Sequence, residues 1–317
     1  MSAGPRFGNI GVLMGGYSSE REISLKSGRA VAAALSAAGH QVTPVDITAQ
    51  DKQKIIEQVR SAGMDIAFIA LHGRLGEDGV IASILEEMDI LYTGSGPQAG
   101  QKAFNKITAQ RIFKTQGLAV ADHVCISDGK IMDFKEAFAA LKKLPFVVKA
   151  ACEGSSIGIY VVRHPSQWEG AIRDALSFGP QVIIEKFIKG RELTAGILDR
   201  EALPLVEIQP KGAFFDFTSK YQKGLAQYTV PAQVPEDLGK QRRQLALAAH
   251  EALDCRGFSR VDIRVDEEMR PFILEINTIP GFTETSLFPK AAQEAGYSFI
   301  DVCEKLLDLA NGKETQR

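Results

Sequence analysis

The chain has 317 residues, of which 45% are hydrophobic and 24% charged, and its net charge at pH 7 is −2. This composition is ordinary for a globular protein with two or three domains, and the near-neutral charge predicts neither a nucleic-acid nor a membrane partner. No apolar run approaches the ~20 residues of a membrane span, and residues 1–8 carry no signal-peptide pattern. Four scattered cysteines indicate reduced thiols in the cytoplasm and argue against a zinc site or a disulfide framework.

The first part of the chain alternates strands and helices. Apolar and amphipathic periodicity predicts strands over residues 9–14, 41–47 and 65–71, with helices over 20–38 and 51–62. This order implies a parallel sheet with crossover helices, in which ligands bind beyond the carboxyl ends of the strands. Glu20 and His72 both lie just past such strand ends.

Two glycine-containing segments follow these strands. Gly15-Gly16 lacks the Gly-x-Gly-x-x-Gly spacing of a dinucleotide site, so a bare Rossmann interpretation is disfavoured. His72 opens a loop, residues 72–79, that combines three glycines with charged residues. A lone histidine after a strand is more often a packed or capping residue, but this setting favours a binding loop.

A loop rich in small residues is predicted in the middle of the chain. Residues 92–97 indicate a linker and a domain boundary, and a helix is predicted over 106–116. The strand at 145–149 carries Lys149 and continues into a Gly/Ser loop at 150–158. The backbone N–H groups of such a loop bind phosphate oxygens, and the lysine adds positive charge. An ordinary hairpin turn with a surface lysine is the alternative, and the segment is not a Walker A loop.

Two further segments are compatible with nucleotide binding. The apolar strand at 182–188 could hold a flat purine by backbone bonds and packing, or could be an edge strand with exposed charges. The segment from Pro210 to Pro231 lacks periodicity and is predicted to be a long mobile loop of the kind that often covers a site.

The strands at residues 260–265 and 272–277 are predicted to form a hairpin closed by residues 267–270. In that register Asp262 lies opposite Glu275, and Arg260 lies opposite Asn277. Two carboxylates and an amide on one face are hard oxygen ligands that suit Mg²⁺ together with substrate phosphates. A solvated face with paired surface charges explains the hairpin alone equally well.

Several motifs, in order along nearly the whole chain, together resemble one family. They are Gly15-Gly16-x-Ser18-x-Glu20-Arg21-Glu22-x-Ser24-Leu25-x-Ser27-Gly28, His72-Gly73-x-x-Gly76-Glu77-Asp78-Gly79, Tyr92-Thr93-Gly94-Ser95-Gly96, Glu153-Gly154-Ser155-Ser156-x-Gly158, Lys220-Tyr221 and Glu275-x-Asn277-Thr278-x-Pro280-Gly281-x-Thr283-x-x-Ser286-Leu287. The chain resembles the bacterial D-alanine–D-alanine ligases of the ATP-grasp superfamily.

The resemblance implies an architecture and a reaction. The fold would be α/β and α+β: an N-terminal parallel-sheet (pre-ATP-grasp) domain, residues 1–97, followed by a two-lobed ATP-grasp domain. That domain would comprise a central lobe, residues 98–184, and a C-terminal lobe, residues 185–317, with the metal and catalytic residues. The reaction would join two D-alanine molecules through a D-alanyl phosphate, giving D-alanyl-D-alanine, ADP and phosphate for peptidoglycan precursor synthesis. ATP, two Mg²⁺ (or Mn²⁺) ions and a homodimer are implied.

The resemblance also assigns residues to ATP and the metal ions. The residues implied to contact ATP are Lys106, Lys149, Glu153, Ser155, Ser156, Glu185, Lys186, Ile188, Glu192, Lys220 and Asn277. Within this set the lysines at 106, 149 and 220 contact phosphates, residues 185, 186 and 188 frame adenine, and Glu192 contacts the ribose. The implied metal ligands are Asp262, Glu275 and Asn277.

A third group is assigned to D-alanine and the reacting atoms. Glu20 would hold the first ammonium group, and Ser286 and Leu287 would receive the second carboxylate. The full set of implied D-alanine-binding residues is Glu20, His72, Arg260, Gly281, Ser286 and Leu287. The implied catalytic residues are Glu20, Ser155, Tyr221, Arg260 and Gly281, the last two as oxyanion donors. The sequence departs from the family pattern at Asn105, Val120-Ala121, Ala150, Phe215 and Phe217, which affects fine specificity rather than the reaction class.

Two alternatives remain from the sequence. A relative that joins D-alanine to D-lactate or D-serine would share most of these motifs, although retention of Tyr221 favours an amine nucleophile. A catalytically silent ATP-binding regulator is disfavoured because it would not need Asp262, Glu275, Asn277 and Arg260 together.

Overall fold

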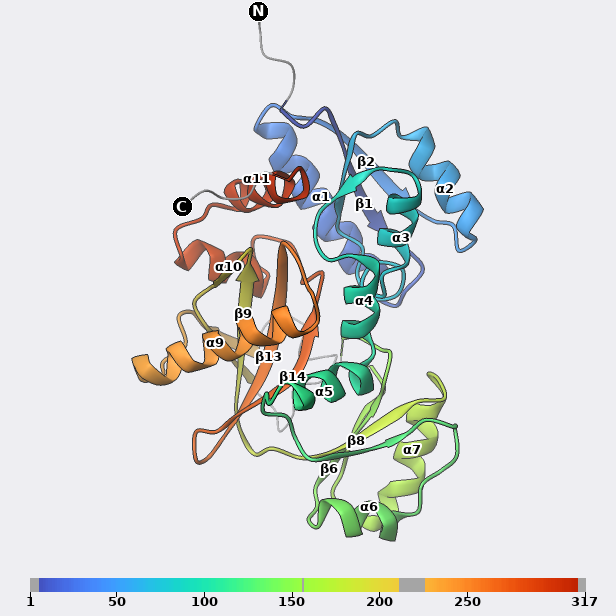
Figure 1. The fold of residues 1–317 in the computed structure, drawn as a ribbon, viewed down its shortest axis with the longest axis vertical. Helices are drawn as coiled ribbons and strands as arrows, with labels where there is room; N and C mark the ends of the chain where they lie inside the picture. Colours follow the sequence, from blue (N-terminus) through green and yellow to red (C-terminus); the bar gives the residue numbers. More distant parts are fainter. Residues whose placement is uncertain (1–5, 156, 211–225, 313–317) are drawn as a thin grey trace, which may run out of the picture.

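The computed structural model describes residues 6–155, 157–210 and 226–312 of the chain. Its strands form three sheets that follow one another along the long axis of the molecule (Figure 1). A parallel sheet from the N-terminal part lies at the top of this view, and an antiparallel sheet lies at the bottom. The sheet that contains most of the C-terminal strands lies between them.

The N-terminal sheet is parallel and has the strand order β2-β1-β3-β4. Its elements are β1 (Asn9–Gly15), α1 (Arg21–Ala37), β2 (Gln41–Ile47), α2 (Lys52–Ser61), β3 (Ile66–Ile69), α3 (Val80–Glu87) and β4 (Leu91–Tyr92). All four residues of β3 are buried, as expected for an inner strand of a parallel sheet covered on both faces. The predicted alternation of strands and helices is therefore confirmed.

The second sheet is antiparallel, with the order β5-β8-β6-β7. Its elements are β5 (His123–Ile126), α6 (Phe134–Leu141), β6 (Phe146–Ala150), β7 (Ile159–Val162), the 3₁₀ turn η1 (Pro165–Gln167), α7 (Trp168–Leu176) and β8 (Val182–Lys186). Phe146 and Val148 of β6 share a core with Trp168 of α7. Because side chains alternate along a strand, Val147 and Lys149 lie on the opposite face of this sheet.

The third sheet has the order β12-β11-β9-β13-β14, with β10 paired to β9. Its strands are β9 (Gly190–Leu198), β10 (Glu201–Ala202), β11 (Val206–Pro210), β12 (Ala226–Thr229), β13 (Phe258–Asp266) and β14 (Pro271–Asn277). One core combines Val261 and Ile263 of β13 with residues of α4 (Pro97–Phe104), α5 (Lys106–Thr115) and α9 (Glu236–Ala252). The chain ends in α10 (Leu287–Glu294) and α11 (Phe299–Ala310).

The hairpin of β13 and β14 has the predicted register. Asp262 pairs with Glu275 and Arg260 pairs with Asn277, and residues 267–270 connect the two strands. A register shift follows between Asp262 and Ile263, so that Ile263 pairs with Ile273. This bulge was not foreseen, because the alternation of polar and apolar residues sets the face of a strand but leaves room for one extra residue.

Two predicted connections differ from the observed ones. Of the long loop predicted between Pro210 and Pro231, residues 226–229 instead form β12, which pairs with β11 because its backbone completes the edge of the sheet. Residues 211–225 of that segment lie outside the described part of the chain. The linker predicted at 92–97 is shorter, since Tyr92 belongs to β4 and Pro97 begins α4.

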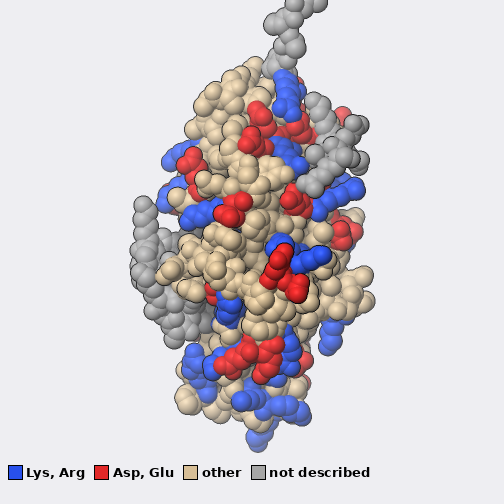
Figure 2. Space-filling model, turned by 90° about the vertical axis from the view of Figure 1, so that its left-hand side faces the viewer, with Lys and Arg blue, Asp and Glu red and all other residues tan. Residues whose placement is uncertain are grey.

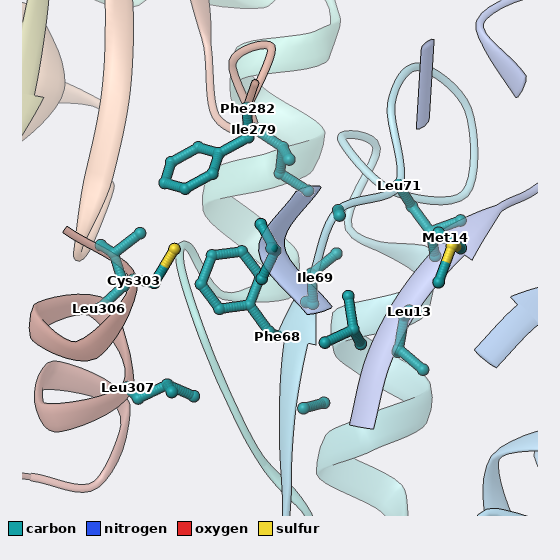
Figure 3. Packing of buried hydrophobic residues seen from close by; sticks show 14 of the residues in the cluster. Leu13, Met14, Phe68, Ile69, Leu71, Ile279, Phe282, Cys303, Leu306 and Leu307 are labelled. Atoms are coloured by element: carbon teal, nitrogen blue, oxygen red, sulfur yellow. The ribbon is translucent and has the colours of Figure 1, made fainter. Parts of the chain in front are cut away.

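The largest hydrophobic core joins the two ends of the chain. Phe68 and Ile69 of β3 pack with Ile279 and Phe282 from the segment after β14, and with Cys303 and Leu306 of α11 (Figure 3). The Phe68 and Phe282 rings meet edge to face, with centroids 5.5 Å apart. The segment after β14 is therefore anchored on the N-terminal sheet, close to the carboxyl ends of β1 and β3.

Charged side chains of both signs are interspersed over the face shown in Figure 2. Ion pairs also form elsewhere on the surface, such as that of Lys52, at the start of α2, with Glu87, at the end of α3, at 2.6 Å. All four cysteines are free thiols. Among the helices that the structure describes, none is long and apolar enough to cross a membrane.

One buried histidine makes the stability of this fold depend on pH. His250 of α9 contacts the Ser259 hydroxyl at 2.7 Å, and burial lowers its pKa from 6.5 to about 4. The unfolded chain therefore binds a proton between these pH values that the folded chain does not, so stability falls as pH drops below 6.5. Between pH 7 and pH 5 this costs about 2 kcal/mol.

We expect a His250→Gln variant to escape most of this loss. Urea unfolding of the wild type and the variant at pH 7 and pH 5 measures it, and the drop in unfolding free energy should be smaller in the variant by about 2 kcal/mol. Equal drops in both proteins would contradict the assignment.

Candidate active site

A pocket opens between the second and third sheets. It encloses about 680 Å³ including its open mouth, which is within the usual range of ligand sites. Strands β6, β7 and β8 form one wall, and β13, β14 and the start of β9 form the other. The lining residues are Ala121, Val147, Lys149, Ile159, Glu185, Lys186, Phe187, Ile188, Glu192, Asp262, Arg264, Leu274 and Glu275. Seven of them, Lys149, Glu185, Lys186, Ile188, Glu192, Asp262 and Glu275, were predicted from the sequence as site residues.

A buried ion pair lies in the wall formed by the second sheet. The Lys149 ammonium is 2.5 Å from a Glu185 carboxylate oxygen, and both side chains are more than nine-tenths buried. Val147 pairs with Glu185 across β6 and β8, so the two charged residues lie on the pocket face two positions apart. The surface-lysine alternative for this segment is therefore wrong.

The opposite wall holds the residues around Glu192. The Arg264 guanidinium donates to the Glu192 carboxylate at 2.8 Å and to the Ile188 backbone carbonyl at 3.1 Å. Lys186 is partly exposed, with its ammonium 4.0 Å from Asp122. Arg264 thus fixes the connection between β8 and β9, a contact that the sequence did not indicate because it joins residues 72 positions apart.

Lys106 links three parts of the site. Its ammonium donates to the Glu153 carbonyl at 2.5 Å and lies 3.3 Å from the Glu275 carboxylate, and its backbone N–H donates to the Ala151 carbonyl. The first residue of α5 is thereby held between the Gly/Ser loop and β14. The Glu153 carboxylate accepts a bond from Arg74 of the 72–79 loop at 2.8 Å.

The face of β13 and β14 carries the expected cluster of oxygen groups. Asp262 is nearly buried and accepts both arms of the Arg260 guanidinium, at 2.8 and 2.7 Å. Thr194 of β9 donates to the same carboxylate at 2.6 Å, and the Asn277 amide approaches it at 3.3 Å. The alternative of a solvated hairpin face is wrong for Asp262, which is only 4% exposed.

This cluster fits a divalent cation that also binds phosphates. Within the described residues, no group of three or more His, Cys, Asp or Glu side chains is placed to hold a metal by itself. Asp262 and Glu275 supply two carboxylates and Asn277 an amide oxygen. Mg²⁺ is usually bound by one or two carboxylates with waters and substrate phosphates, so this donor set suits it.

Glu20 and Ser155 meet where the N-terminal sheet approaches the Gly/Ser loop. The Ser155 hydroxyl donates to the Glu20 carboxylate, and both residues are nearly buried. A Cβ on Gly73 or on Gly154 would lie within 2.8 Å of a Glu20 carboxylate oxygen. The glycines at these two positions therefore allow the backbone to approach the carboxylate closely, which explains their place in the motifs.

The 72–79 loop contributes two ionisable groups, of which His72 is buried and Glu77 half-buried. Burial lowers the pKa of His72, whose ring contacts the Ile279 carbonyl at 2.9 Å. Burial and the nearby Glu20 carboxylate raise the pKa of Glu77 to about 8, so this carboxyl group is largely protonated at pH 7. Glu77 belongs to the 72–79 motif, but the sequence alone predicts no role for it. The signal that could have indicated a role is the position of this acid between Gly76 and Gly79, both of which pack closely against backbone carbonyl groups.

Gly281 and Ser286 are neighbours after β14. A Cβ on Gly281 would lie 3.3 Å from the Ser286 hydroxyl, which accepts a bond from the Thr283 N–H at 3.1 Å. Ser286 is the N-cap residue of α10, and Leu287 is its first residue. The backbone N–H groups at this helix start can receive an anion. Three predicted site residues, Ser156, Lys220 and Tyr221, lie outside the described part of the chain.

Comparisons with known proteins agree with this geometry. Profiles described as D-ala D-ala ligase N-terminus and D-ala D-ala ligase C-terminus match residues 9–60 and 112–308. A D-alanine–D-alanine ligase of Desulforudis audaxviator is 48% identical, over 95% of this chain and 98% of its own length. One of Geotalea uraniireducens is 44% identical, over 97% of each chain.

Solved structures give the same result. The D-alanine–D-alanine ligase of Bacillus anthracis complexed with ATP has a TM-score of 0.84 and 29% identity, and the match covers 96% of this chain and 97% of that one. The VanG D-Ala:D-Ser ligase of Enterococcus faecalis has a TM-score of 0.80 and 27% identity, over 96% of this chain and all of that one.

The fold, with its pocket between two antiparallel sheets, is that of an ATP-grasp ligase. Within that class, the identity to curated relatives over nearly the full length shows that the chain belongs to the D-alanine–D-alanine ligase family.

Proposed function

We propose that this protein joins two D-alanine molecules at the expense of ATP, giving D-alanyl-D-alanine, ADP and phosphate. The observation that carries the proposal is the convergence of Lys149, Glu185, Asp262 and Glu275 on one pocket between the two antiparallel sheets. ATP is the substrate assigned to this pocket, with adenine beside Glu185, Lys186 and Ile188 and the ribose beside Glu192. The product serves peptidoglycan precursor synthesis, in the cytoplasm, and the enzyme acts as a homodimer.

The first step activates a carboxylate that is itself a poor electrophile. The D-alanine carboxylate oxygen attacks the γ-phosphorus of ATP, the bond from that phosphorus to the β,γ-bridging oxygen breaks, and ADP leaves as D-alanyl phosphate forms. Phosphoryl transfer depends mostly on positioning and charge neutralisation. Lys106 and Lys149 supply fixed positive charge, and the backbone N–H groups around Ser155 and Ser156 cover the phosphates. Two Mg²⁺ or Mn²⁺ ions, held by Asp262, Glu275 and Asn277, would add the remaining positive charge.

The second step needs donors for a tetrahedral oxyanion. The neutral amine of the second D-alanine attacks the acyl carbon. As the tetrahedral intermediate collapses, the bond from that carbon to the phosphate oxygen breaks, phosphate leaves, and the nitrogen gives up one proton to phosphate or solvent. Arg260 and the Gly281 N–H donate to the oxyanion, and such preorganised donors are worth more than flexible ones. The α10 N-terminus at Ser286 and Leu287 receives the second carboxylate.

Glu20 holds the ammonium group of the first D-alanine. Its carboxylate is nearly buried between Gly73 and Gly154 and accepts a hydrogen bond from the Ser155 hydroxyl. The orientation of the carboxylate is therefore fixed before the substrate binds. His72, in the loop that follows β3, precedes Gly73 and belongs to the same D-alanine subsite. We assign Tyr221 a hydrogen bond with the Glu20 and Ser155 side chains.

A second candidate function follows from one neighbour. VanG of Enterococcus faecalis is a D-Ala:D-Ser ligase, and its fold matches this chain almost as well, with a TM-score of 0.80. Curated relatives that are 48%, 44% and 41% identical are named D-alanine–D-alanine ligases, which favours D-alanine as the second substrate here.

Phosphate release measured with ATP and Mg²⁺ tests the proposal directly. We expect release that depends on D-alanine, with D-alanyl-D-alanine as the product by mass spectrometry. The same assay with equal D-alanine and D-serine, or D-alanine and D-lactate, identifies the second substrate. The proposed function would be overturned by phosphate release without D-alanine, or by more product containing D-serine or D-lactate than D-alanyl-D-alanine.

The role of Glu20 predicts an effect on one substrate only. A Glu20→Gln variant keeps the size of the side chain but removes the charge that pairs with an ammonium group. A charged hydrogen bond is worth about 1.5–3 kcal/mol, so the KM for D-alanine should rise at least about tenfold while the KM for ATP changes little. Glu22→Gln, on the exposed face of the same helix, is the control. Equal changes in both Michaelis constants would remove Glu20 from this role.

The role of Glu275 predicts a loss of turnover without loss of fold. In Glu275→Gln one carboxylate charge disappears from the β13–β14 face, so the proposed ions, and the phosphates they position, would be held less well. Misplacement of reacting atoms costs on the order of 100-fold, and kcat should fall by about that factor. Titration with Mg²⁺ and Mn²⁺ should show weaker activation by both. The control is Glu268→Gln in the connection of the same hairpin, whose carboxylate contacts Arg270 at the surface. Near wild-type turnover in Glu275→Gln would exclude an essential role.

A further inference from the structure

Ser27 of α1 is a fully buried hydroxyl that joins the N-terminal sheet to the segment after β14. Its oxygen lies 2.9 Å from the His72 Nε2 atom and accepts a bond from the Phe282 N–H at 3.2 Å. Residue 282 is 255 positions away in sequence, so this contact spans nearly the whole chain. Nothing in the function proposed above uses Ser27.

The direction of each hydrogen bond follows from the atoms involved. The Ile279 carbonyl can only accept, so the His72 Nδ1 atom, 2.9 Å away, must carry a proton. Burial lowers the pKa of His72, so the ring is neutral and its Nε2 atom accepts. The Ser27 hydroxyl therefore donates to Nε2, and its lone pair receives the Phe282 N–H. The donors run in one order, from Phe282 to Ser27 to His72 to Ile279.

This chain of bonds closes on itself through the backbone. Its two ends, the Ile279 carbonyl and the Phe282 N–H, belong to the same short stretch of residues, and Gly281 lies between them. The Phe282 ring is fixed as well, with edge-to-face contacts to Phe68 at 5.5 Å and Phe258 at 5.8 Å between ring centroids. Side chains of α1 and of the loop after β3 thereby hold both sides of the Gly281 peptide.

We propose that Ser27 is a positioning residue for Gly281: through His72 and the Phe282 N–H, it sets the direction in which the Gly281 N–H points. The proposal rests on the function proposed above, in which this N–H stabilises the oxyanion of the second step. A hydrogen-bond donor that is displaced from an oxyanion loses catalytic value even if the fold persists. Ser27 touches neither substrate nor reacting atoms.

The chain offers a matched control for this proposal. Ser24, one helical turn before Ser27 on α1, is also fully buried, accepts a bond from the Gly15 N–H at 2.8 Å and donates to the Ala70 carbonyl at 2.8 Å. Ser24→Ala and Ser27→Ala each remove one buried hydroxyl that joins two partners. The Ser24 bonds stay within the N-terminal sheet, whereas the Ser27 bonds reach the Gly281 segment.

The experiment compares both variants with the wild type in stability, steady-state kinetics and single turnover. Loss of an oxyanion donor costs about 100- to 1,000-fold in kcat, and a displaced donor should cost about tenfold or more. We expect this fall in Ser27→Ala, confined to dipeptide formation, with ADP formation in a single turnover and the KM for ATP within about twofold of the wild type. Ser24→Ala should lose stability but keep its kcat.

Each outcome decides between the proposals. If wild-type phosphate release does not depend on D-alanine, the proposed function fails. If the wild type is active and Ser27→Ala loses no more kcat than Ser24→Ala, or slows ADP formation equally, the role of Ser27 fails. Should Ser27→Ala not fold, Ser27→Cys keeps a side chain of similar size with a much weaker donor and acceptor. Wild-type kcat in that variant would overturn the proposal.

Discussion

The pairing of β13 with β9 on one side and β14 on the other is the constraint on which this active site depends. It places Asp262 opposite both Thr194 and Glu275, so that three strands contribute oxygen groups to one spot. The same alternation buries Val261 and Ile263 in the core beneath α5 and α9. A slip of one residue would exchange the two sets, bringing a carboxylate into the core and leaving the pocket without it. The hydrophobic core and the site thus enforce the same register.

The second constraint is the return of the chain to its beginning. The segment after β14 packs Ile279 and Phe282 against β3, and α11 extends the same core with Leu306 and Leu307. This core is built from both ends of the sequence, and it brings Gly281 to the carboxyl ends of β1 and β3, where Glu20 and His72 lie. A ligand site between a parallel sheet and two antiparallel lobes therefore needs α11 for its geometry, even though α11 carries none of its polar groups.

Much of this arrangement could be predicted from the sequence, because it is expressed in local patterns. Alternation predicted the parallel sheet and the pairing of Asp262 with Glu275, and the family motifs named Glu20 with Ser155. The bulge after Asp262 and the strand at 226–229 were missed because a single extra residue, or four residues with weak periodicity, leave little trace in a pattern. The contacts Lys106–Glu275, Arg264–Glu192 and Ser27–Phe282 were missed for another reason: each depends on two elements that meet only in the folded chain.

The contacts among charged groups also bear on how ATP can bind. Each cation that is described near the phosphate and oxyanion positions already contacts a carboxylate: Lys149 with Glu185, Lys106 with Glu275, and Arg260 with Asp262. These pairs are mostly buried, so their mutual attraction is little screened by solvent. Bringing a triphosphate beside them adds negative charge that these three cations, each already compensated, cannot offset alone. Burying an uncompensated charge is costly, so the site requires positive charge delivered together with the nucleotide. Two of the three compensating carboxylates, Asp262 and Glu275, are also the oxygen groups that the proposed divalent ions would bind, so the charge balance of the site agrees with the proposal that ATP binds together with such ions.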